Sequence, residues 1–249
     1  MKRIIVDHPQ LVAFWDFQEE PGQERVSQGP KAHALQEGAG EVARDEDGVF
    51  GPYSARLDEG KWFFIPRMAC PELNIAGPQA QVTIAAWVKR GQKSNTQCEF
   101  VAGMWNETNK KRQYGLFLNL YIWESSEQVC GHVSSIGGPT PGHRWCMDAS
   151  IGSHAVPRGE WQFVAFTYDG EYARSYLNGI LDEREGRNPY PYPGGLYDGG
   201  EDGADFTVGA VDRLHEIGNY FVGSFGGLAI YNKALSANEL SELYAATLV

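Results

Sequence analysis

Side chains that could move a proton or neutralise a charge are concentrated in the middle third of the chain. His132 and His143 are candidates for a general acid or base, because imidazole titrates close to neutral pH. Tyr114 could also donate or accept a proton, Arg112 could neutralise a developing negative charge, and Asp148 could act as a carboxylate. These five residues are the candidate catalytic groups. For each histidine the alternative is an ordinary surface or core residue.

The same stretch combines aromatic rings with amide, hydroxyl and charged groups. A sugar needs both kinds of group, since its hydroxyls take planar donors and acceptors while its apolar face stacks on aromatic rings. These residues predict a poly- or oligosaccharide partner, and the alternative is an ordinary solvated face of a sheet. The candidate binding residues are Trp105, Asn106, Glu107, Gln113, Phe117, Asn119, Ser134 and Arg144, with Asn188 and Tyr190 from a later segment.

Two kinds of cleavage are compatible with these groups. Elimination from a uronic acid requires a base, an acid and a group that holds the carboxylate, and the candidates supply this set. Hydrolysis requires two carboxyl groups about 5 Å or about 6.5–9.5 Å apart, which Glu99, Glu107 and Asp148 could provide. We therefore expect a carbohydrate-active protein and favour an enzyme, either a polysaccharide lyase or a glycoside hydrolase. The alternatives are a non-catalytic lectin-like or adhesion module, and a protein-interaction sandwich without a sugar site.

The elements that must position these groups are short β-strands. Runs rich in Val, Ile, Phe, Tyr, Trp and Thr recur between clusters of Gly, Pro and Asn, which is typical of an all-β sandwich. The predicted strands are Val12–Phe17, Ser54–Leu57, Trp62–Ile65, Val82–Arg90, Glu99–Trp105, Tyr114–Leu120, Gln128–Ser134, Trp145–Ser150, Trp161–Tyr168, Tyr172–Leu177, Asp205–Ala210 and Tyr220–Tyr231.

Turn and cap signals fix the order of several elements. Asp169-Gly170 and Asn178-Gly179 each lie between two such runs and suit the positive φ angles of a type I′ turn. The strand between them is therefore expected to be antiparallel to both neighbours. Ser236 and Glu239 form a capping-box pattern ahead of apolar residues at helical spacing, which predicts a short C-terminal helix.

One long segment, Arg187–Asp205, lacks strand character and is rich in tyrosine and proline. Long irregular segments in a compact domain usually carry function. Its tyrosines could stack on sugar rings, and its prolines lower the entropy lost on ordering. We expect it to form a wall or lid over the same face, the alternative being a surface excursion that contacts nothing.

Five segments of the chain resemble a known family: Leu11–Phe17, Val82–Lys89, Glu160–Gly170, Tyr176–Gly179 and Gly226–Ser236. Their order and spacing are similar to the laminin-G-like jelly roll of the concanavalin A-like lectin/glucanase superfamily. The resemblance implies a two-sheet antiparallel jelly-roll sandwich, here a single domain over residues 1–249, whose concave face receives a carbohydrate in many relatives. The fold hosts lectins, adhesion modules, hydrolases and lyases. The Glu-x-Asp-x-x-Glu strand motif of the glucanase relatives is absent from this sequence, as are the motif strings of the common jelly-roll alginate lyases.

Relatives with this fold often hold a structural calcium ion, and one acidic loop of the chain could do so. Asp198, Asp202 and Asp205 offer the hard oxygen ligands that Ca²⁺ takes, although the loop lacks the order of an EF-hand. The alternative is a solvated acidic turn whose repulsion Arg187 or Arg213 relieves. No other cofactor is expected.

The charge of the chain excludes some partners. With 21 Lys and Arg against 32 Asp and Glu, the net charge of -11 disfavours nucleic acid and anionic membranes. The first residues contain no signal peptide and no run is long enough to span a membrane, so we expect a cytoplasmic protein unless a leader has been removed. Four cysteines without metal-ligand spacing read as buried thiols, and in an oxidising compartment Cys130 and Cys146 could pair. The sequence leaves the oligomeric state open.

Overall fold

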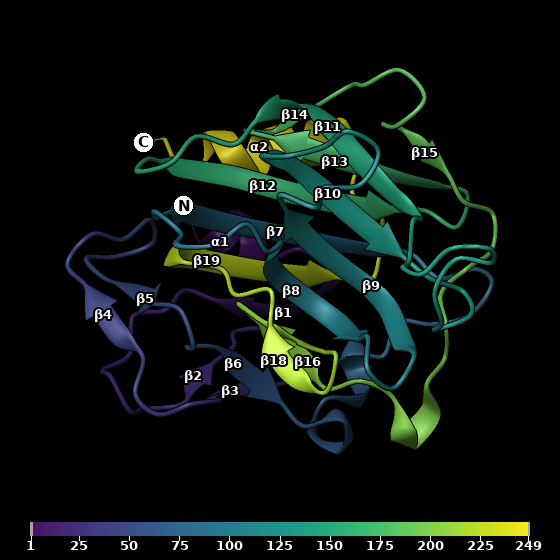
Figure 1. Ribbon diagram of the computed structural model, residues 1–249. Helices are drawn as coiled ribbons and strands as arrows, with labels where there is room; N and C mark the ends of the chain where they lie inside the picture. Colours follow the sequence, from purple (N-terminus) through teal and green to yellow (C-terminus); the bar gives the residue numbers. More distant parts are fainter. Residues whose placement is uncertain (1, 249) are drawn as a thin grey trace.

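Two antiparallel sheets packed face to face make up most of the molecule in the computed structural model, which describes residues 2–248 (Figure 1). The first sheet follows the order β14 (Ile180–Leu181), β13 (Tyr172–Leu177), β12 (Trp161–Tyr168), β7 (Val82–Arg90), β19 (Gly223–Tyr231), β5 (Ser54–Leu57), β4 (Ala43–Asp45), with β1 (Leu11–Trp15) on β19 and β15 (Tyr190–Pro191) on β13. The all-β sandwich expected from the sequence is confirmed. The two ends of the expected domain, residues 1 and 249, lie outside the described residues.

The second sheet carries the middle third of the chain. Its order is β11 (Ala149–Ala155), β10 (Gln128–Val133), β9 (Lys111–Leu118), β8 (Glu99–Asn106), β16 (Phe206–Val208), β6 (Phe63–Ile65), β3 (Ala34–Glu37), β2 (Arg25–Val26), and β17 (Val211–Arg213) joins β8 and β18 (Glu216–Gly218). Most neighbours are antiparallel, but β17 runs parallel to β8 through a single pair, Asp212 and Asn106.

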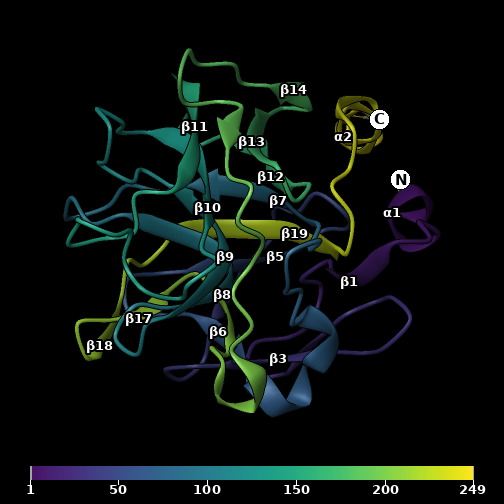
Figure 2. The ribbon, with the colours of Figure 1, turned by 90° about the vertical axis from the view of Figure 1, so that its right-hand side faces the viewer.

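Helices are short and lie outside the sheets. They are α1 (Arg3–Val6), α2 (Ala237–Ala245) and the 3₁₀ helices η1 (Arg67–Ala69), η2 (Pro71–Leu73) and η3 (Gly200–Asp202). The predicted C-terminal helix is confirmed: the Ser236 hydroxyl accepts from the backbone of Glu239, whose carboxylate accepts from the backbone of Ser236. Figures 1 and 2 show α1 and α2 on one side of the molecule. In the described part of the chain no helix has the length and apolar character to cross a membrane.

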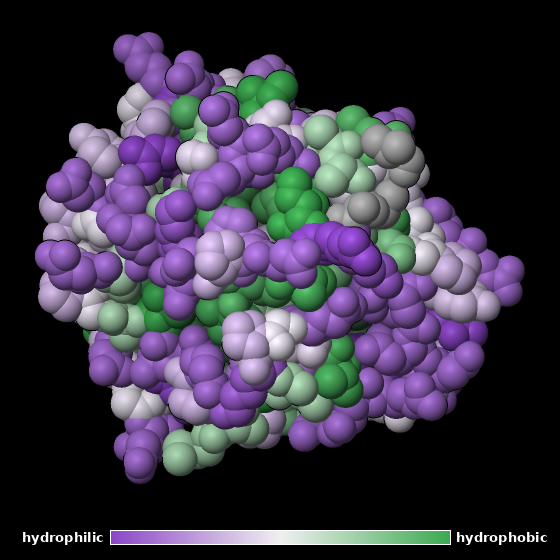
Figure 3. All heavy atoms as spheres, turned by 180° about the vertical axis from the view of Figure 1, so that it is seen from behind, coloured by the Kyte–Doolittle hydropathy of each residue, from purple (hydrophilic) through white to green (hydrophobic). Residues whose placement is uncertain are grey.

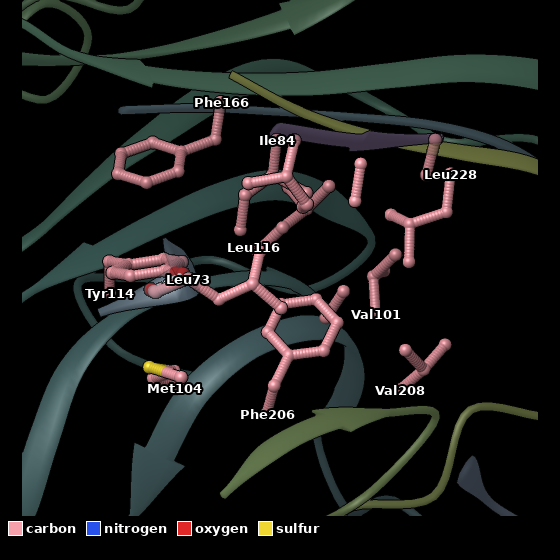
Figure 4. Packing of buried hydrophobic residues seen from close by; sticks show 14 of the residues in the cluster. Leu73, Ile84, Val101, Met104, Tyr114, Leu116, Phe166, Phe206, Val208 and Leu228 are labelled. Carbon is pink, nitrogen blue, oxygen red and sulfur yellow. Dashed lines mark hydrogen bonds between the residues drawn. The ribbon is translucent and has the colours of Figure 1, made fainter. Parts of the chain in front are cut away.

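The core fills the space between the sheets. Alternation along each strand sends one set of side chains inward, and Figure 4 shows Phe166 and Ile84 of the first sheet facing Tyr114 and Leu116 of the second. Gly131 of β10 lies at a close approach, because a Cβ on this residue would overlap the Phe166 ring. Figure 3 shows that the outside of the molecule, seen from behind, is mostly hydrophilic with apolar residues exposed in limited areas.

Both predicted hairpins are confirmed. β12 and β13 pair antiparallel across Asp169-Gly170, and β13 pairs with β14 across Asn178-Gly179. Asn178 and Gly179 have φ angles of 50° and 77°, the positive values expected for a type I′ turn. At the other hairpin Gly170 has a φ of 96° but Asp169 has no positive φ, so the expected type I′ turn is not formed there.

The predicted strand Trp145–Ser150 is wrong in position. β11 begins at Ala149 and continues to Ala155, because Trp145–Asp148 belong to the preceding loop. That loop is held by Thr140, whose hydroxyl donates to the Asp148 carboxylate and accepts from the backbone N–H of Met147. The apolar residues of 145–148 therefore cover the outer face of the second sheet instead of extending it. Short edge strands such as β2, β4, β17 and β18 were not predicted, since strands of two or three residues have no visible period.

Candidate functional site

A pocket of about 240 Å³ opens on the outer face of the second sheet. β8, β9 and β10 form its base, β17 closes one side, and the segments 119–122 and 145–146 form the rest of its wall. The lining residues are Cys98, Trp105, Glu107, Arg112, Phe117, Leu120, Tyr121, Ile122, His132, Trp145, Cys146, Arg213 and Asn219.

Three rings from three adjacent strands form the base of this pocket, which we call the sheet pocket. The ring centroid of Trp105 is 4.8 Å from that of His132 and 5.7 Å from that of Phe117. Gly115 is paired with His132 and leaves room for these rings: a Cβ there would lie 2.9 Å from Phe100 and 3.1 Å from Phe117. The three rings can pack together on the outer face because the outward position at Gly115 holds no side chain.

A bulge in the β8–β9 pairing places a charge beside the rings. The register shifts between Met104 and Trp105, so that Trp105 lies opposite Arg112 and both line the sheet pocket. The extra residue, Gln113, turns away from the pocket and donates to Asn74 and to the carbonyl of Ile75. The bulge therefore decides that Arg112, and not Gln113, lines the sheet pocket, although both residues were predicted to belong to the site.

His132 is neutral in this environment. The side chain is only 4% exposed, and burial lowers the pKa of the imidazole from 6.5 to about 3. The Nδ1 atom lies 2.9 Å from the carbonyl oxygen of Asp148. A carbonyl can only accept, so Nδ1 carries the hydrogen and Nε2 keeps its lone pair. His132 thus offers a hydrogen-bond acceptor in the base of the pocket.

Glu107 faces two arginines across the sheet pocket. Burial raises the pKa of its carboxyl, while the charges of Arg112 and Arg213 oppose this shift. Arg213 has an ion pair with Glu216 at 4.0 Å, and Arg112 donates from Nη1 to the carbonyl of Gly137 at 3.3 Å. Since a guanidinium has five N–H donors, Arg112 retains most of its hydrogen-bonding capacity.

A second depression adjoins the sheet pocket and has a volume of about 230 Å³. The two share Glu107, Arg112 and Trp145 as lining residues, and the second adds Lys110 and Arg144. The guanidinium carbon of Arg144 lies 4.7 Å from the Trp145 ring centroid. The shared residues make the two depressions neighbouring parts of one groove, which we call the sheet groove.

The structure brings together part of the set predicted from the sequence. Of the predicted residues, Trp105, Glu107, Arg112, Phe117 and His132 line the sheet pocket, and Arg144 lines the adjoining depression. They come from β8, β9, β10 and the loops beside them, and neighbouring strands in the sequence are neighbours in the sheet.

Three of the candidate catalytic residues have other positions. Tyr114 points into the core and donates its hydroxyl to the carbonyl of Leu73 at 2.6 Å, and burial raises its pKa, so it cannot exchange protons with a ligand on the outer face. His143 is exposed on the loop before β11, outside the lining of both depressions. The Asp148 carboxylate accepts from Thr140 and from Tyr190, the latter at 2.9 Å, while its backbone carbonyl orients His132.

The other predicted binding residues stabilise turns. Asn106 donates to Asp212 and accepts from the backbone of Asn109, which closes the β8–β9 turn. Asn119 is buried with a φ of 63°, and the Ser134 hydroxyl accepts from the backbone of Gly137. Amide and hydroxyl side chains bond their own turns as readily as ligands, which is why the sequence alone could not separate the two roles.

The segment Arg187–Asp205 is not a wall of the sheet groove. Figure 2 shows it, in green, descending along the side of the sandwich. Asn188 is buried and donates to the carbonyls of Ser175 and Asp182, and the Tyr192 hydroxyl contacts Ser135. Tyr190 belongs to β15, which pairs with β13. The tyrosines are used to fasten the segment to the sheets, so the expectation of a lid is corrected.

The acidic loop is organised by an arginine that the sequence reasoning did not consider. The Asp205 carboxylate accepts from the backbone N–H of Arg67 at 2.8 Å, and Asp198 lies 3.9 Å from its guanidinium and accepts from Asn74. Asp202 is exposed. Within residues 2–248 no three His, Cys, Asp or Glu side chains are grouped closely enough to hold a metal ion. A calcium ion stays an untested prediction.

Several lining residues were missed. Arg213 and Asn219 reach the sheet pocket from the last quarter of the chain, through the parallel pairing of β17 with β8, and no local pattern indicates such a contact. Cys98 and Cys146 also line it, and all four cysteines are free thiols. Burial raises the pKa of Cys98 to about 11, so this thiol stays protonated.

Residues 68–241 match the family model described as the concanavalin A-like lectin/glucanases superfamily. The chain belongs to this superfamily. The match covers most of both sheets and all of the strands that form the sheet groove. Among curated proteins, none matches the sequence.

Solved structures with the superfamily's jelly roll are similar over nearly all of this chain. Domain 4 of AbnA, a GH43 extracellular arabinanase from Geobacillus stearothermophilus solved with arabinotriose, has a TM-score of 0.60 at 19% identity and covers 94% of this chain and 98% of that chain. The receptor binding domain of the botulinum neurotoxin C/D mosaic serotype has 0.61 at 12% identity, covering 98% and 52%. Trypanosoma rangeli sialidase with 2,3-difluorosialic acid has 0.60 at 14%, covering 96% and 33%. At these identities the likeness concerns the fold, and this chain spans about half or less of the last two chains.

Proposed function

We propose that the chain binds an oligo- or polysaccharide, with one sugar ring seated in the sheet pocket. The observation that carries the proposal is a pocket whose base holds the buried rings of Trp105, Phe117 and His132, while the accessible rings of Tyr121 and Trp145 lie at its rim among hydrogen-bonding and charged groups. Such a site offers apolar contact to the ring and polar contacts to its hydroxyls. The arabinotriose complex of the similar arabinanase domain supports a sugar as the ligand class.

Two aromatic side chains reach the rim and are the first that a ligand meets. Tyr121 is 48% exposed, and Trp145 is half-buried where the two depressions join. Rings in such positions can stack on a sugar. Substituting them should weaken binding without the loss of core packing that substitution of Trp105 would cause. The rim therefore offers a means of testing binding without unfolding the protein.

The test is Trp145→Ala, with Trp161→Ala as its matched control. Trp161 is also half-buried and also lies beside a cation, Lys89, at 5.4 Å, but it belongs to the first sheet and lines a different depression. Affinity electrophoresis or calorimetry against a panel of polysaccharides should show a loss of roughly five- to tenfold for Trp145→Ala and none for the control. Equal affinities of both variants and wild type would contradict the proposed site.

A second candidate function is cleavage of the bound polysaccharide by elimination. It is favoured by two groups in one pocket that can exchange protons: His132 with a free Nε2, and Glu107, whose pKa burial raises. The base takes the proton beside the sugar carboxylate, the bond to the glycosidic oxygen breaks as a double bond forms, and the acid protonates the leaving oxygen. A bound uronate would also raise the low pKa of His132 towards a useful range.

Hydrolysis is supported less by the same geometry. Among the described residues that line the sheet groove, Glu107 is the one carboxylate, whereas hydrolysis by two carboxyl groups needs a partner at a defined distance. Glu99, considered for this role, is fully buried and bonded to Arg90. Asp148 is bonded to Thr140 and Tyr190.

Cleavage is tested by following ultraviolet absorbance and new reducing ends together. Elimination gives both signals, hydrolysis gives reducing ends alone, and binding without either indicates a lectin-like module. If elimination occurs, His132→Gln and Glu107→Gln should each lower turnover by roughly 10²–10⁴-fold, whereas His143→Gln should not. Full activity in both pocket variants would remove them from the mechanism.

A further inference from the structure

The sheet groove has a local charge opposite to that of the whole chain. The described residues that line its two depressions include the cations Lys110, Arg112, Arg144 and Arg213 and the single carboxylate Glu107. The chain as a whole has a net charge of -11. A cationic groove on an acidic protein is not expected from composition, and it attracts anionic ligands while the remaining surface repels them.

Arg112 differs from the other buried arginines of the molecule. Arg25, Arg67 and Arg90 each have a carboxylate oxygen within 4.0 Å, at 3.2, 3.9 and 2.9 Å respectively. Arg112 is equally buried, at 4% exposure, yet among the described residues no carboxylate lies within this distance, and its side chain donates to one carbonyl. A buried cation is costly unless it is paired and hydrogen-bonded. Arg112 lines both depressions and so lies where they meet.

We propose that the ligand is an acidic saccharide whose carboxylate or sulfate group binds Arg112 at the junction of the two depressions. This inference rests on the proposed function, because it names the class of sugar that the same site takes. One sugar ring lies in the sheet pocket beside the rim aromatic rings, its anionic group completes the pairing of the guanidinium, and the saccharide continues past Arg144. The planar fork of an arginine suits both kinds of anionic group.

Glu107 reduces the positive charge of the sheet groove without cancelling it. Its carboxylate partly balances Arg112 and Arg213, but the groove retains more cations than carboxylates. A neutral sugar would leave the excess positive charge of the groove uncompensated in a partly desolvated site. An anionic sugar would neutralise it. We therefore expect the affinity for an acidic polymer to fall as salt rises, because exposed charges such as Arg144 and Lys110 are screened.

The experiment compares polymers that differ only in charge. Polygalacturonate is set against its methyl ester, and dextran sulfate against dextran, with calorimetry on the full chain at low and high salt. Each acidic polymer should bind about ten- to a hundredfold more tightly than its neutral partner. If only polygalacturonate binds more tightly than its neutral partner, the anionic group is a carboxylate. If only dextran sulfate does so, the anionic group is a sulfate.

Three variants test whether the preference for acidic polymers depends on the arginines of the sheet groove. Arg112→Gln and Arg213→Gln should each remove about tenfold or more of the affinity for the acidic polymer while leaving that for the neutral polymer unchanged. The control is Arg56→Gln, an exposed arginine of the first sheet that is paired with Asp45. Arg112 is buried, so its fold is checked by circular dichroism, and if that variant unfolds, Arg213→Gln carries the test.

The outcomes separate this inference from the proposed function. Equal binding of acidic and neutral polymers, with no effect of the groove arginines, overturns the acidic ligand and leaves saccharide binding intact. An equal loss of affinity in Arg56→Gln also overturns the acidic ligand site, since the polymer would then be attracted by positive charge anywhere on the surface and not by the sheet groove. If none of a wide panel of polymers binds, the proposed function itself fails.

Discussion

At the scale of single residues, His132 shows how burial sets chemistry. The ring packs between Trp105 and Phe117 and has a carbonyl, not a carboxylate, as its Nδ1 partner. Burial, with a smaller contribution from the charge of Arg112, outweighs the hydrogen bond to the Asp148 carbonyl that favours the imidazolium, so the ring enters the site as a neutral acceptor. A histidine selected in the sequence because imidazole titrates near neutral pH is therefore held neutral to a much lower pH in the fold.

This pKa predicts a specific acid sensitivity. The folded pKa is about 3 and the unfolded value 6.5, so the unfolded chain binds more protons at this residue between those pH values. The free energy of unfolding should then decrease as the pH falls below about 6.5, by up to about 1.4 kcal/mol per pH unit from this group. In urea denaturation, the free energy of unfolding of His132→Gln should decrease less than that of wild type as the pH falls. His143→Gln should show the same pH dependence as wild type. Identical pH dependence of all three proteins would contradict the neutral ring.

Asn188 is the clearest case of a predicted binding residue with a structural role. Both ends of its amide are used: Nδ2 donates to two carbonyls, at 2.8 and 2.6 Å, and Oδ1 accepts from the backbone of Ser175 at 3.0 Å. Asn188→Ala should lower the free energy of unfolding by about 1–3 kcal/mol, because buried backbone groups lose their partners. Saccharide affinity should stay at the wild-type value. Asn238→Ala, at an exposed position, is the control and should change stability by less than about 0.5 kcal/mol.

At the scale of elements, the site depends on irregularities in the strands. The bulge in β9 turns Arg112 to the outer face beside Trp105, and the short strand β17 adds Arg213 from a distant part of the chain. Regular alternation would have placed a different residue of β9 beside Trp105. The composition of the pocket is therefore a consequence of register, which is set by pairing partners.

The contact between β10 and β12 gives a prediction about packing. Gly131 follows Cys130 and precedes His132, and it faces Phe166 in the space between the sheets. Gly131→Ala should lower stability by about 1–3 kcal/mol, since the added methyl overlaps a ring that has no free space to move into. Gly138→Ala, at a loop position where a Cβ meets no atom within 4 Å, should leave the thermal midpoint nearly unchanged. Equal midpoints for both variants would mean that the sheets adjust at no cost.

At the scale of the whole molecule, an ion-pair network with a buried centre joins the two sheets. Arg90 of β7 donates to both oxygens of Glu99 of β8, each at 2.9 Å, and both side chains are fully buried. Arg90 also donates to Glu127, and Arg158 donates to Glu99 and Glu127. The network closes one end of the sandwich with charges that are mutually satisfied.

Removal of one member should be costly. Arg90→Met leaves Glu99 buried without its main partner, so we expect a loss of about 3–5 kcal/mol and a fall of the thermal midpoint by roughly 6–20 °C. The matched substitution Arg56→Met removes an exposed pair and should cost less than about 1 kcal/mol. A midpoint of Arg90→Met within a few degrees of wild type would show that the network does not hold the sheets together.

The sequence by itself determined the parts of this protein that depend on local chemistry. The strands Val82–Arg90, Trp161–Tyr168 and Tyr172–Leu177 match their predicted limits, because long β-branched and aromatic runs between turn residues have few other solutions. The two hairpins and the capped helix follow from residues a few positions apart. These features also carried the resemblance to the superfamily.

Only the tertiary structure decided which side chains share the sheet groove. Trp105, Phe117 and His132 could be anticipated because their strands are neighbours in sequence and in the sheet. Arg213 could not, since it arrives by a parallel contact across more than a hundred residues. Tyr114 was proposed for its hydroxyl, although alternation groups it with the apolar Leu116 and Leu118, and the structure places all three in the core. Period and turn chemistry act over a few residues, whereas burial, pKa and pocket membership depend on what the rest of the chain brings alongside.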